Sequence, residues 1–219
     1  MKKGIDVSYC QEGMDFQAAA DAGIEFCIVR LGRLGDSGTR YLDTSFVDNI
    51  NAAIAAGMDV GVYFYTKATD TEAAAEDAAF VTAVLEQYCN GTELKAGVWY
   101  DVEDAPTTGQ CDRETITAIC SRFVCEMNEA GYNNVGIYSS YDWLTNKIDT
   151  AQLADYVPYW PANYGSRTNW FAKENPEKRV PVWQCADDWT DGTNEANNMH
   201  YDGDYMYEDG DDPTQPIDE

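Results

Sequence analysis

The stretch Gly97-Val-Trp-Tyr-Asp-Val-Glu-Asp104 predicts a buried β-strand over residues 96–103. Its β-branched and aromatic side chains suit a pleated surface. Side chains alternate along a strand, so Trp99, Asp101 and Glu103 share one face of it. Two neighbouring carboxylates repel each other, which raises the pKa of one of them and makes that group a candidate general acid. A strand end carrying two solvated acids is the alternative interpretation of this short pattern.

The composition is that of one globular domain with a sizeable core. The chain has 219 residues, 44% of them hydrophobic, and α/β barrels of this length are commonly single domains. The 39 acidic residues exceed the 14 lysines and arginines and give a net charge of −25. Such a charge repels nucleic acid and anionic membrane surfaces, so we expect neither as a partner.

No targeting or membrane-spanning segment is visible in the sequence. Met1-Lys-Lys3 leads directly into a strand pattern, and the chain lacks the run of about eighteen apolar residues that a transmembrane helix needs. We therefore expect a protein that is secreted or released without a signal peptide visible in this chain.

The cysteines do not indicate a metal site. There are seven of them, they lack C-x-x-C spacing, and His200 is the single histidine. We expect no metal and no other cofactor, and mostly free thiols from a reducing setting. A disulfide between Cys89 and Cys111 stays open.

Strand and helix patterns alternate through the first 150 residues. Strands are predicted at 4–8, 25–31, 58–65, 96–103 and 135–138. Helices are predicted at 15–22, at 43–56 with Asp43 or Thr44 as N-cap, at about 69–88 with a Thr69–Glu72 capping box, at 112–130 and near 141–147. Between them, 32–41 is predicted to be a Gly-rich loop without P-loop spacing. Repeated alternation of this kind favours parallel strands with right-handed crossovers.

The pattern changes after residue 150, where strands at 156–160 and 179–184 have no long helix between them. This favours an α/β barrel of the TIM type with helices around part of its circumference. The residues at the strand ends would then converge at the C-terminal mouth of the barrel, where barrel enzymes keep their chemistry: Asp6, Tyr65, Asp101, Glu103, Tyr138 and Gln184. We expect residues 1–208 to form one catalytic barrel domain and 209–219 an acidic tail or the start of a linker.

Several motifs in this order resemble those of the glycoside hydrolase family 25 lysozymes, the muramidases of autolysins and phage endolysins. They are Gly4-Ile-Asp-Val-Ser8 with Gln11, Phe26-Cys-Ile-Val-Arg30, Gly61-Val-Tyr-Phe-Tyr65, Tyr100-Asp-Val-Glu103, Gly136-Ile-Tyr138, Trp160 with Ala162 and Tyr164, and Val182-Trp-Gln184. The resemblance covers about residues 4–185. It implies an eight-stranded barrel with about five helices and three final strands that are poor in helices.

The resemblance also implies the activity, which is cleavage of the β-1,4 bond between N-acetylmuramic acid and N-acetylglucosamine in peptidoglycan. By that resemblance Glu103 is the general acid, Asp101 stabilises positive charge or positions the substrate's acetamido group, and Asp6 is a third acid. Inversion and substrate-assisted retention both remain open. The expected partner is the glycan strand of the bacterial cell wall, and the protein is expected to be a monomer.

Further residues are candidate sugar contacts: Tyr65, Tyr138, Trp160, Tyr164 and Gln184. The family's C-terminal motif is altered here, and its last acid would fall on Met206. We expect Asp204 to take its place, with Asp202 as the alternative. Two other functions stay open, a glycosidase acting on another N-acetylated polymer such as chitin and a catalytically silent wall-binding protein.

Overall fold

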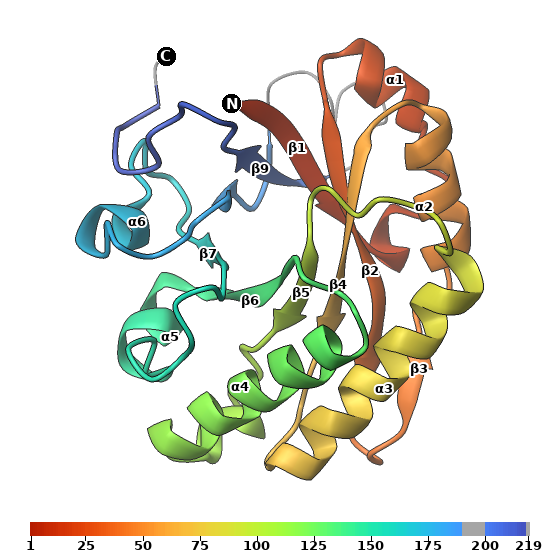
Figure 1. Ribbon diagram of the computed structural model, residues 1–219. Coiled ribbons are helices and arrows are strands. Elements are labelled where there is room, and N and C mark those ends of the chain that lie inside the picture. Colours follow the sequence, from red (N-terminus) through yellow and green to blue (C-terminus); the bar gives the residue numbers. More distant parts are fainter. Residues whose placement is uncertain (190–199, 218–219) are drawn as a thin grey trace.

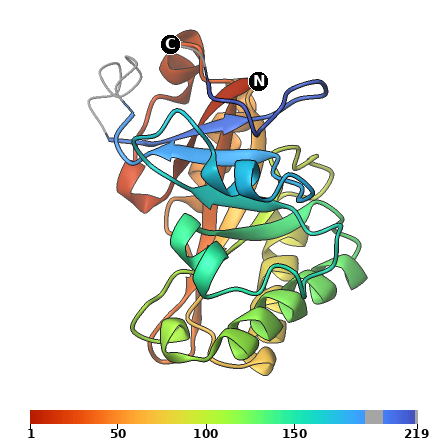
Figure 2. The same cartoon turned by 90° about the vertical axis from the view of Figure 1, so that its left-hand side faces the viewer.

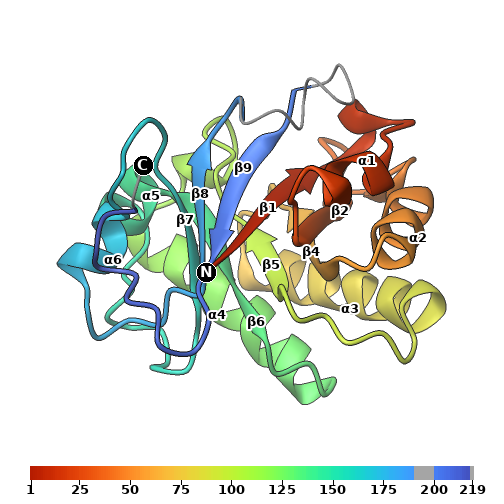
Figure 3. The same cartoon turned by 90° about the horizontal axis from the view of Figure 1, so that it is seen from above.

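The computed structural model describes residues 1–189 and 200–217, and its centre is a closed β-barrel (Figures 1 and 3). Within these residues, eight strands close the barrel in the order β1-β9-β8-β7-β6-β5-β4-β2, and β2 pairs with β1. A short strand, β3, forms an antiparallel hairpin on β2. The strands are β1 (Lys2–Val7), β2 (Phe26–Leu34), β3 (Arg40–Leu42), β4 (Asp59–Tyr65), β5 (Val98–Asp101), β6 (Val135–Ser140), β7 (Tyr159–Ala162), β8 (Val182–Ala186) and β9 (Asp202–Met206). The predicted eight-stranded barrel is confirmed.

Helices cover part of the barrel, with α1 to α3 on one side and α5 and α6 on the other (Figures 1 and 2). The described residues contain six: α1 (Phe16–Asp21), α2 (Phe46–Ala55), α3 (Thr71–Tyr88), α4 (Arg113–Glu129), α5 (Tyr141–Asn146) and α6 (Trp170–Glu174). Five were predicted. The missed α6 is short, and its signal was the Asn169 cap, whose side chain accepts a hydrogen bond from the Ala172 amide at 3.1 Å.

Three local predictions are wrong in detail. The N-caps of α2 and α3 are Ser45 and Asp70, one or two residues from those predicted. The segment 32–41 is not all loop, because β2 continues to Leu34 and turns back into β3. The five strands predicted before residue 150 pair in parallel, as the alternation had favoured, and only the last barrel strand, β9, runs antiparallel to its two neighbours in the described barrel.

Strand β5 separates two apolar layers. Tyr100 points outward, where its ring stacks on Phe123 of α4 with centroids 3.9 Å apart, and its hydroxyl donates to the buried Asp77 of α3 at 2.8 Å. Trp99 points into the barrel and packs on Trp160. The predicted alternation of faces is therefore correct, and it directs Asp101 to the inside of the barrel together with Trp99.

The chain ends lie on one side of the molecule, opposite the β2–β3 hairpin (Figure 1). The Met1 amino group forms an ion pair with Asp211 at 2.7 Å, and the Ile217 amide donates to the Arg167 carbonyl at 2.8 Å. The acidic segment is thus held against the domain as far as Ile217. All seven cysteines are within the described residues and are free thiols, so no Cys89–Cys111 disulfide is formed.

Candidate active site

A small cavity of about 90 Å³ lies at the mouth of the barrel. The side chains around it come from seven strands or the residues just after them, and four of them are acids. They are Asp6, Tyr63, Asp101, Glu103, Tyr138, Trp160, Gln184 and Asp202. We call this space the acid cavity. A volume below the 300–1,000 Å³ of usual ligand pockets fits one part of a ligand rather than all of it.

The parallel register brings these residues to one level. Asp101 pairs with Tyr65 of β4 on one side and with Tyr138 of β6 on the other, and Tyr138 pairs in turn with Trp160. The backbone of β5 stays paired with β6 beyond Asp101, because the Val102 amide donates to the Tyr138 carbonyl at 3.0 Å. Glu103 is therefore directed to the same face as Asp101.

Gln184 links the aromatic side of the acid cavity to Asp6. Its Oε1 accepts hydrogen bonds from the hydroxyls of Tyr138 at 2.7 Å and Tyr164 at 2.8 Å. Its Nε2 donates to Asp6 Oδ2 at 2.7 Å. The two phenols thus fix the amide orientation in which the amide nitrogen faces the carboxylate.

Burial sets the protonation of Asp6 and Glu103. It raises the pKa of Asp6 to about 6, against the hydrogen bond from Gln184, which favours the charged form. The pKa of Glu103 is also raised, first by burial and then by the charge of Asp6. The raised pKa of Glu103 favours its protonated form, which is the form that a general acid requires.

Asp101 is more deeply buried than Glu103. Burial holds its pKa well above the ordinary value, the charges of Glu103 and Asp6 raise it further, and the Arg30 guanidinium acts in the opposite direction. Its Oδ1 is buried and has no hydrogen-bond partner among the described residues. This oxygen is an acceptor available to a donor on a ligand in the acid cavity.

Two acids of β9 occupy different depths. Asp202 lines the acid cavity, and burial followed by the charge of Asp6 raises its pKa to about 8. Asp204 is completely buried beneath the cavity, where it accepts a hydrogen bond from Trp160 Nε1 at 2.8 Å. Asp204, the residue predicted to contact substrate, thus lies below the cavity, and its alternative Asp202 lies at it.

Residues 5–192 match the model of glycosyl hydrolases family 25. The chain belongs to this family. It is 27% identical over 163 residues to the autolytic lysozyme of Clostridium acetobutylicum, an alignment that covers 74% of this chain and 45% of that protein.

Solved structures agree with the family 25 assignment. The modular autolysin LytC of Streptococcus pneumoniae superposes with a TM-score of 0.78 at 26% identity, over 94% of this chain and 46% of that one. A second structure of the same autolysin, in complex with a synthetic peptidoglycan ligand, gives a TM-score of 0.77. The bacterial lysozyme of Streptomyces coelicolor shares the fold, with a TM-score of 0.70 at 17% identity and coverage of 95% of this chain and 93% of that one. This family 25 chain spans about half the length of the autolytic relatives that it matches.

The remaining predicted sugar contacts of the family 25 domain fall in different places. Tyr138 and Trp160 line the acid cavity. Tyr164 lies at its edge and is 44% exposed. Tyr65 does not line the cavity, because its hydroxyl donates to Asp104 at 2.8 Å and its ring borders a separate, larger pocket beside the cavity.

One residue of the acid cavity was missed from the sequence. Tyr63 lies two residues before Tyr65, on the same face of β4 and deeper in the barrel, and its ring packs against Trp160 with centroids 6.2 Å apart. The period-two pattern of Gly61-Val-Tyr-Phe-Tyr65 was the signal that placed it there. Among the described residues, no group of three or more His, Cys, Asp or Glu side chains is arranged to hold a metal ion. None of the helices in the described residues is long and apolar enough to cross a membrane.

Proposed function

We propose that this domain is a lysozyme that hydrolyses the β-1,4 bond between N-acetylmuramic acid and N-acetylglucosamine in the peptidoglycan of bacterial cell walls. Family membership supports the reaction class. Two relatives, an autolytic lysozyme and an autolysin bound to a peptidoglycan ligand, support the substrate. The observation that carries the proposal is Glu103, a half-buried acid of raised pKa at the edge of the acid cavity.

Glu103 is the group that protonates the leaving glycosidic oxygen. A general acid must hold its proton at the working pH and reach the substrate. Burial and the charge of Asp6 favour the protonated carboxyl. In the described residues Glu103 takes part in no hydrogen bond that would compete for that proton, and its partial exposure leaves the proton accessible to a sugar at the barrel mouth.

Asp101 positions the acetamido group at C2 of the sugar. Its unpartnered Oδ1 accepts the acetamido N–H, which turns the acetamido oxygen toward the anomeric carbon. The small volume of the acid cavity suits a substituent of this size and not a whole sugar ring. Asp6, ionised near neutral pH, stabilises the positive charge that develops on the sugar in the transition state.

Two routes are compatible with these roles. In substrate-assisted retention the acetamido oxygen attacks the anomeric carbon, and water later opens the resulting ring with Glu103 as base. In inversion a carboxylate activates a water molecule that attacks directly. Proton NMR of the first product distinguishes them, because retention yields the β-anomer and inversion the α-anomer. An oxazoline-type inhibitor that binds at the acid cavity favours the first route.

The test of the function is digestion of purified cell walls, followed by mass spectrometry of the soluble fragments. Fragments with N-acetylmuramic acid at the reducing end are expected, since the bond to its anomeric carbon is the one cleaved. Release of sugars from chitin but not from walls would make the domain a glycosidase of another N-acetylated polymer. Binding to walls without release of fragments would identify a silent wall-binding protein.

A further inference from the structure

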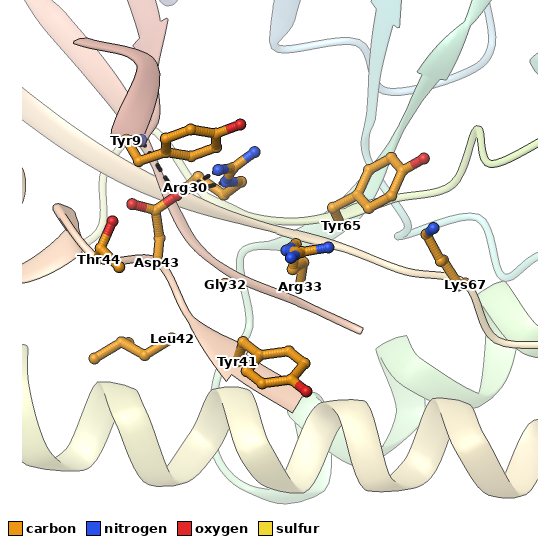
Figure 4. Close-up of a pocket in the computed structure, with 10 residues that line it drawn as sticks. All are labelled: Tyr9, Arg30, Gly32, Arg33, Tyr41, Leu42, Asp43, Thr44, Tyr65 and Lys67. Atoms are coloured by element: carbon orange, nitrogen blue, oxygen red, sulfur yellow. Dashed lines mark hydrogen bonds and ion pairs between the residues drawn. The ribbon is translucent and has the colours of Figure 1, made fainter. Parts of the chain in front are cut away.

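A second pocket of about 550 Å³ lies at the β2–β3 hairpin (Figure 4), and Tyr65 in its lining pairs along the sheet with Asp101 of the acid cavity. Its size is within the range of pockets that bind a substantial part of a ligand. Three cations line it, Arg30, Arg33 and Lys67, against one acid, Asp43, in a protein whose net charge is −25. We call it the cationic pocket. A local concentration of positive charge in an acidic protein favours an anionic ligand there.

The cationic pocket is in register with the catalytic strand. Arg33 of β2 pairs with Tyr65 of β4, and Tyr65 pairs with Asp101 of β5. Neighbouring strands lie about 4.8 Å apart, so the backbone of Arg33 is about 10 Å from that of Asp101. A glycan held in the acid cavity therefore places its nearby substituents within reach of Arg33.

The three cations differ in what already binds them. Arg30 forms an ion pair with the buried Asp43 at 2.6 Å. Lys67 forms ion pairs with the exposed Asp36 at 2.6 Å and with the buried Asp104 at 3.6 Å. Arg33 has no carboxylate at ion-pair distance within the described residues, and its guanidinium lies beside the Tyr41 ring, 5.7 Å from the centroid.

The wall of the cationic pocket is held in place from behind. Arg40, next to Tyr41 on β3, donates to Asp77 at 2.8 Å, to Glu76 at 2.6 Å and to the Ala73 carbonyl at 2.8 Å. These bonds fix the hairpin to α3. In Figure 4, Arg33, Tyr65 and Lys67 lie in a row above Tyr41. The Arg33 guanidinium is thus held on a hairpin that is fixed to α3. This reduces the entropy lost when a ligand binds.

We propose that the cationic pocket binds the carboxylates of the peptide arm that the muramoyl residue carries, with Arg33 as the main contact and Lys67 as the second. This inference rests on the proposed function. A guanidinium pairs with a carboxylate through two parallel hydrogen bonds, while Tyr41 and Tyr65 offer apolar walls to the rest of the arm. The pocket then selects glycans that carry peptides over unsubstituted ones such as chitin.

The test compares two soluble glycans prepared from the same walls, one with its peptides and one from which an amidase has removed them. Both are first freed of phosphate polymers by hydrofluoric acid. Wild-type protein is expected to show a higher kcat/KM on the peptide-bearing glycan. Arg33→Gln is expected to lower the ratio of the two kcat/KM values about tenfold, the loss of one charged hydrogen-bonded contact, mainly through KM.

Arg33→Lys keeps the positive charge but cannot donate two parallel hydrogen bonds to one carboxylate. It is therefore expected to restore only part of the ratio of the two kcat/KM values. Arg122→Gln, on the exposed surface of α4, is the matched control and should leave the ratio unchanged. An equal loss on both glycans in Arg33→Gln, or no loss, overturns the inference. So does an effect that appears only on walls that retain their phosphate polymers, which would assign the pocket to phosphate. Absence of new reducing ends from either glycan with the wild type instead refutes the proposed function.

Discussion

Asp6 and Asp202 face each other directly across the antiparallel pair of β1 and β9, and both line the acid cavity. Residues opposite each other in such a pair have Cβ atoms about 4.5–5.5 Å apart, and like charges at that distance destabilise the fold. The protein therefore keeps a proton on this pair at neutral pH. Burial and the charge of Asp6 account for it, because they raise the pKa of Asp202 to about 8.

This proton makes stability depend on pH. The pKa of Asp202 is about 8 in the folded protein against 3.8 for an ordinary aspartate, so the folded state binds more protons between these values. The contribution of the protonated Asp202 to stability is complete below pH ~4 and is lost as the pH rises through about 8. Asp202→Asn is expected to raise the free energy of unfolding at pH 8.5 by at least about 1 kcal/mol relative to wild type, and by less at pH 5.

Urea unfolding at the two pH values measures this difference. Asp209→Asn removes an exposed carboxylate outside the acid cavity and is the matched control. An equal effect of Asp202→Asn at pH 5 and pH 8.5 would contradict the proposed protonation of the pair.

Glu103 is expected to be required for turnover and dispensable for folding. The Glu103→Gln variant keeps the shape of the side chain but has no acidic proton to give, so kcat should fall by about 10²–10⁴-fold. Its melting temperature should stay within a few degrees of wild type, since the side chain is partly exposed and makes no hydrogen bond with the described residues. Release of reducing ends and thermal unfolding measure the two quantities. Glu86→Gln on the surface of α3 is the control, and undiminished turnover in Glu103→Gln would refute the assignment.

The charge of Asp6 is expected to control the alkaline limit of activity. This charge raises the pKa of Glu103, so Asp6→Asn should lower that pKa. Glu103 would then lose its proton at a lower pH, and the alkaline limb of the kcat/KM profile should shift downward. Asp48→Asn, an exposed acid on α2, should not shift it. An unmoved limb in Asp6→Asn would show that Asp6 does not influence the acid.

The sequence predicted this site unevenly, for physical reasons. Alternation along one strand was enough to place Asp101 and Glu103 on the inner face together with Trp99. The choice between Asp202 and Asp204 depended on the direction and register of β9, which no local pattern specifies. The antiparallel pairing sets Asp202, and not Asp204, opposite Asp6.

The cationic pocket was invisible for a related reason. Gly32 and Gly35 both favour a loop in the local sequence, yet β2 continues through Gly32 to Leu34 and the chain returns as β3. This hairpin brings Tyr41 beside Arg33. Tertiary pairing with β4 stabilises the extended chain against its local preference, and the pocket exists because of it.

Tyr138 and Tyr164 both orient the amide of Gln184, and we expect either hydroxyl alone to be enough to hold it. Both hydroxyls donate to Gln184 Oε1, and this leaves Nε2 to donate to Asp6. Each phenylalanine variant alone removes one neutral hydrogen bond, a loss of about 1 kcal/mol. The double variant frees the amide to turn, so that Asp6 loses the donor that favours its charged form and its pKa rises above about 6.

The acidic limb of the kcat/KM profile reports that ionisation, because Asp6 acts as a carboxylate. It is expected to move to higher pH in the Tyr138→Phe/Tyr164→Phe variant by more than the sum of the two single shifts, as for residues that share one partner. Tyr132→Phe, at a partly buried tyrosine far from the acid cavity, controls for the loss of a phenol. If both phenols act by orienting the Gln184 amide, the remaining hydroxyl compensates for the loss of the first one. Two single shifts that simply add up to the shift of the double variant would therefore mean that the phenols do not act through the amide.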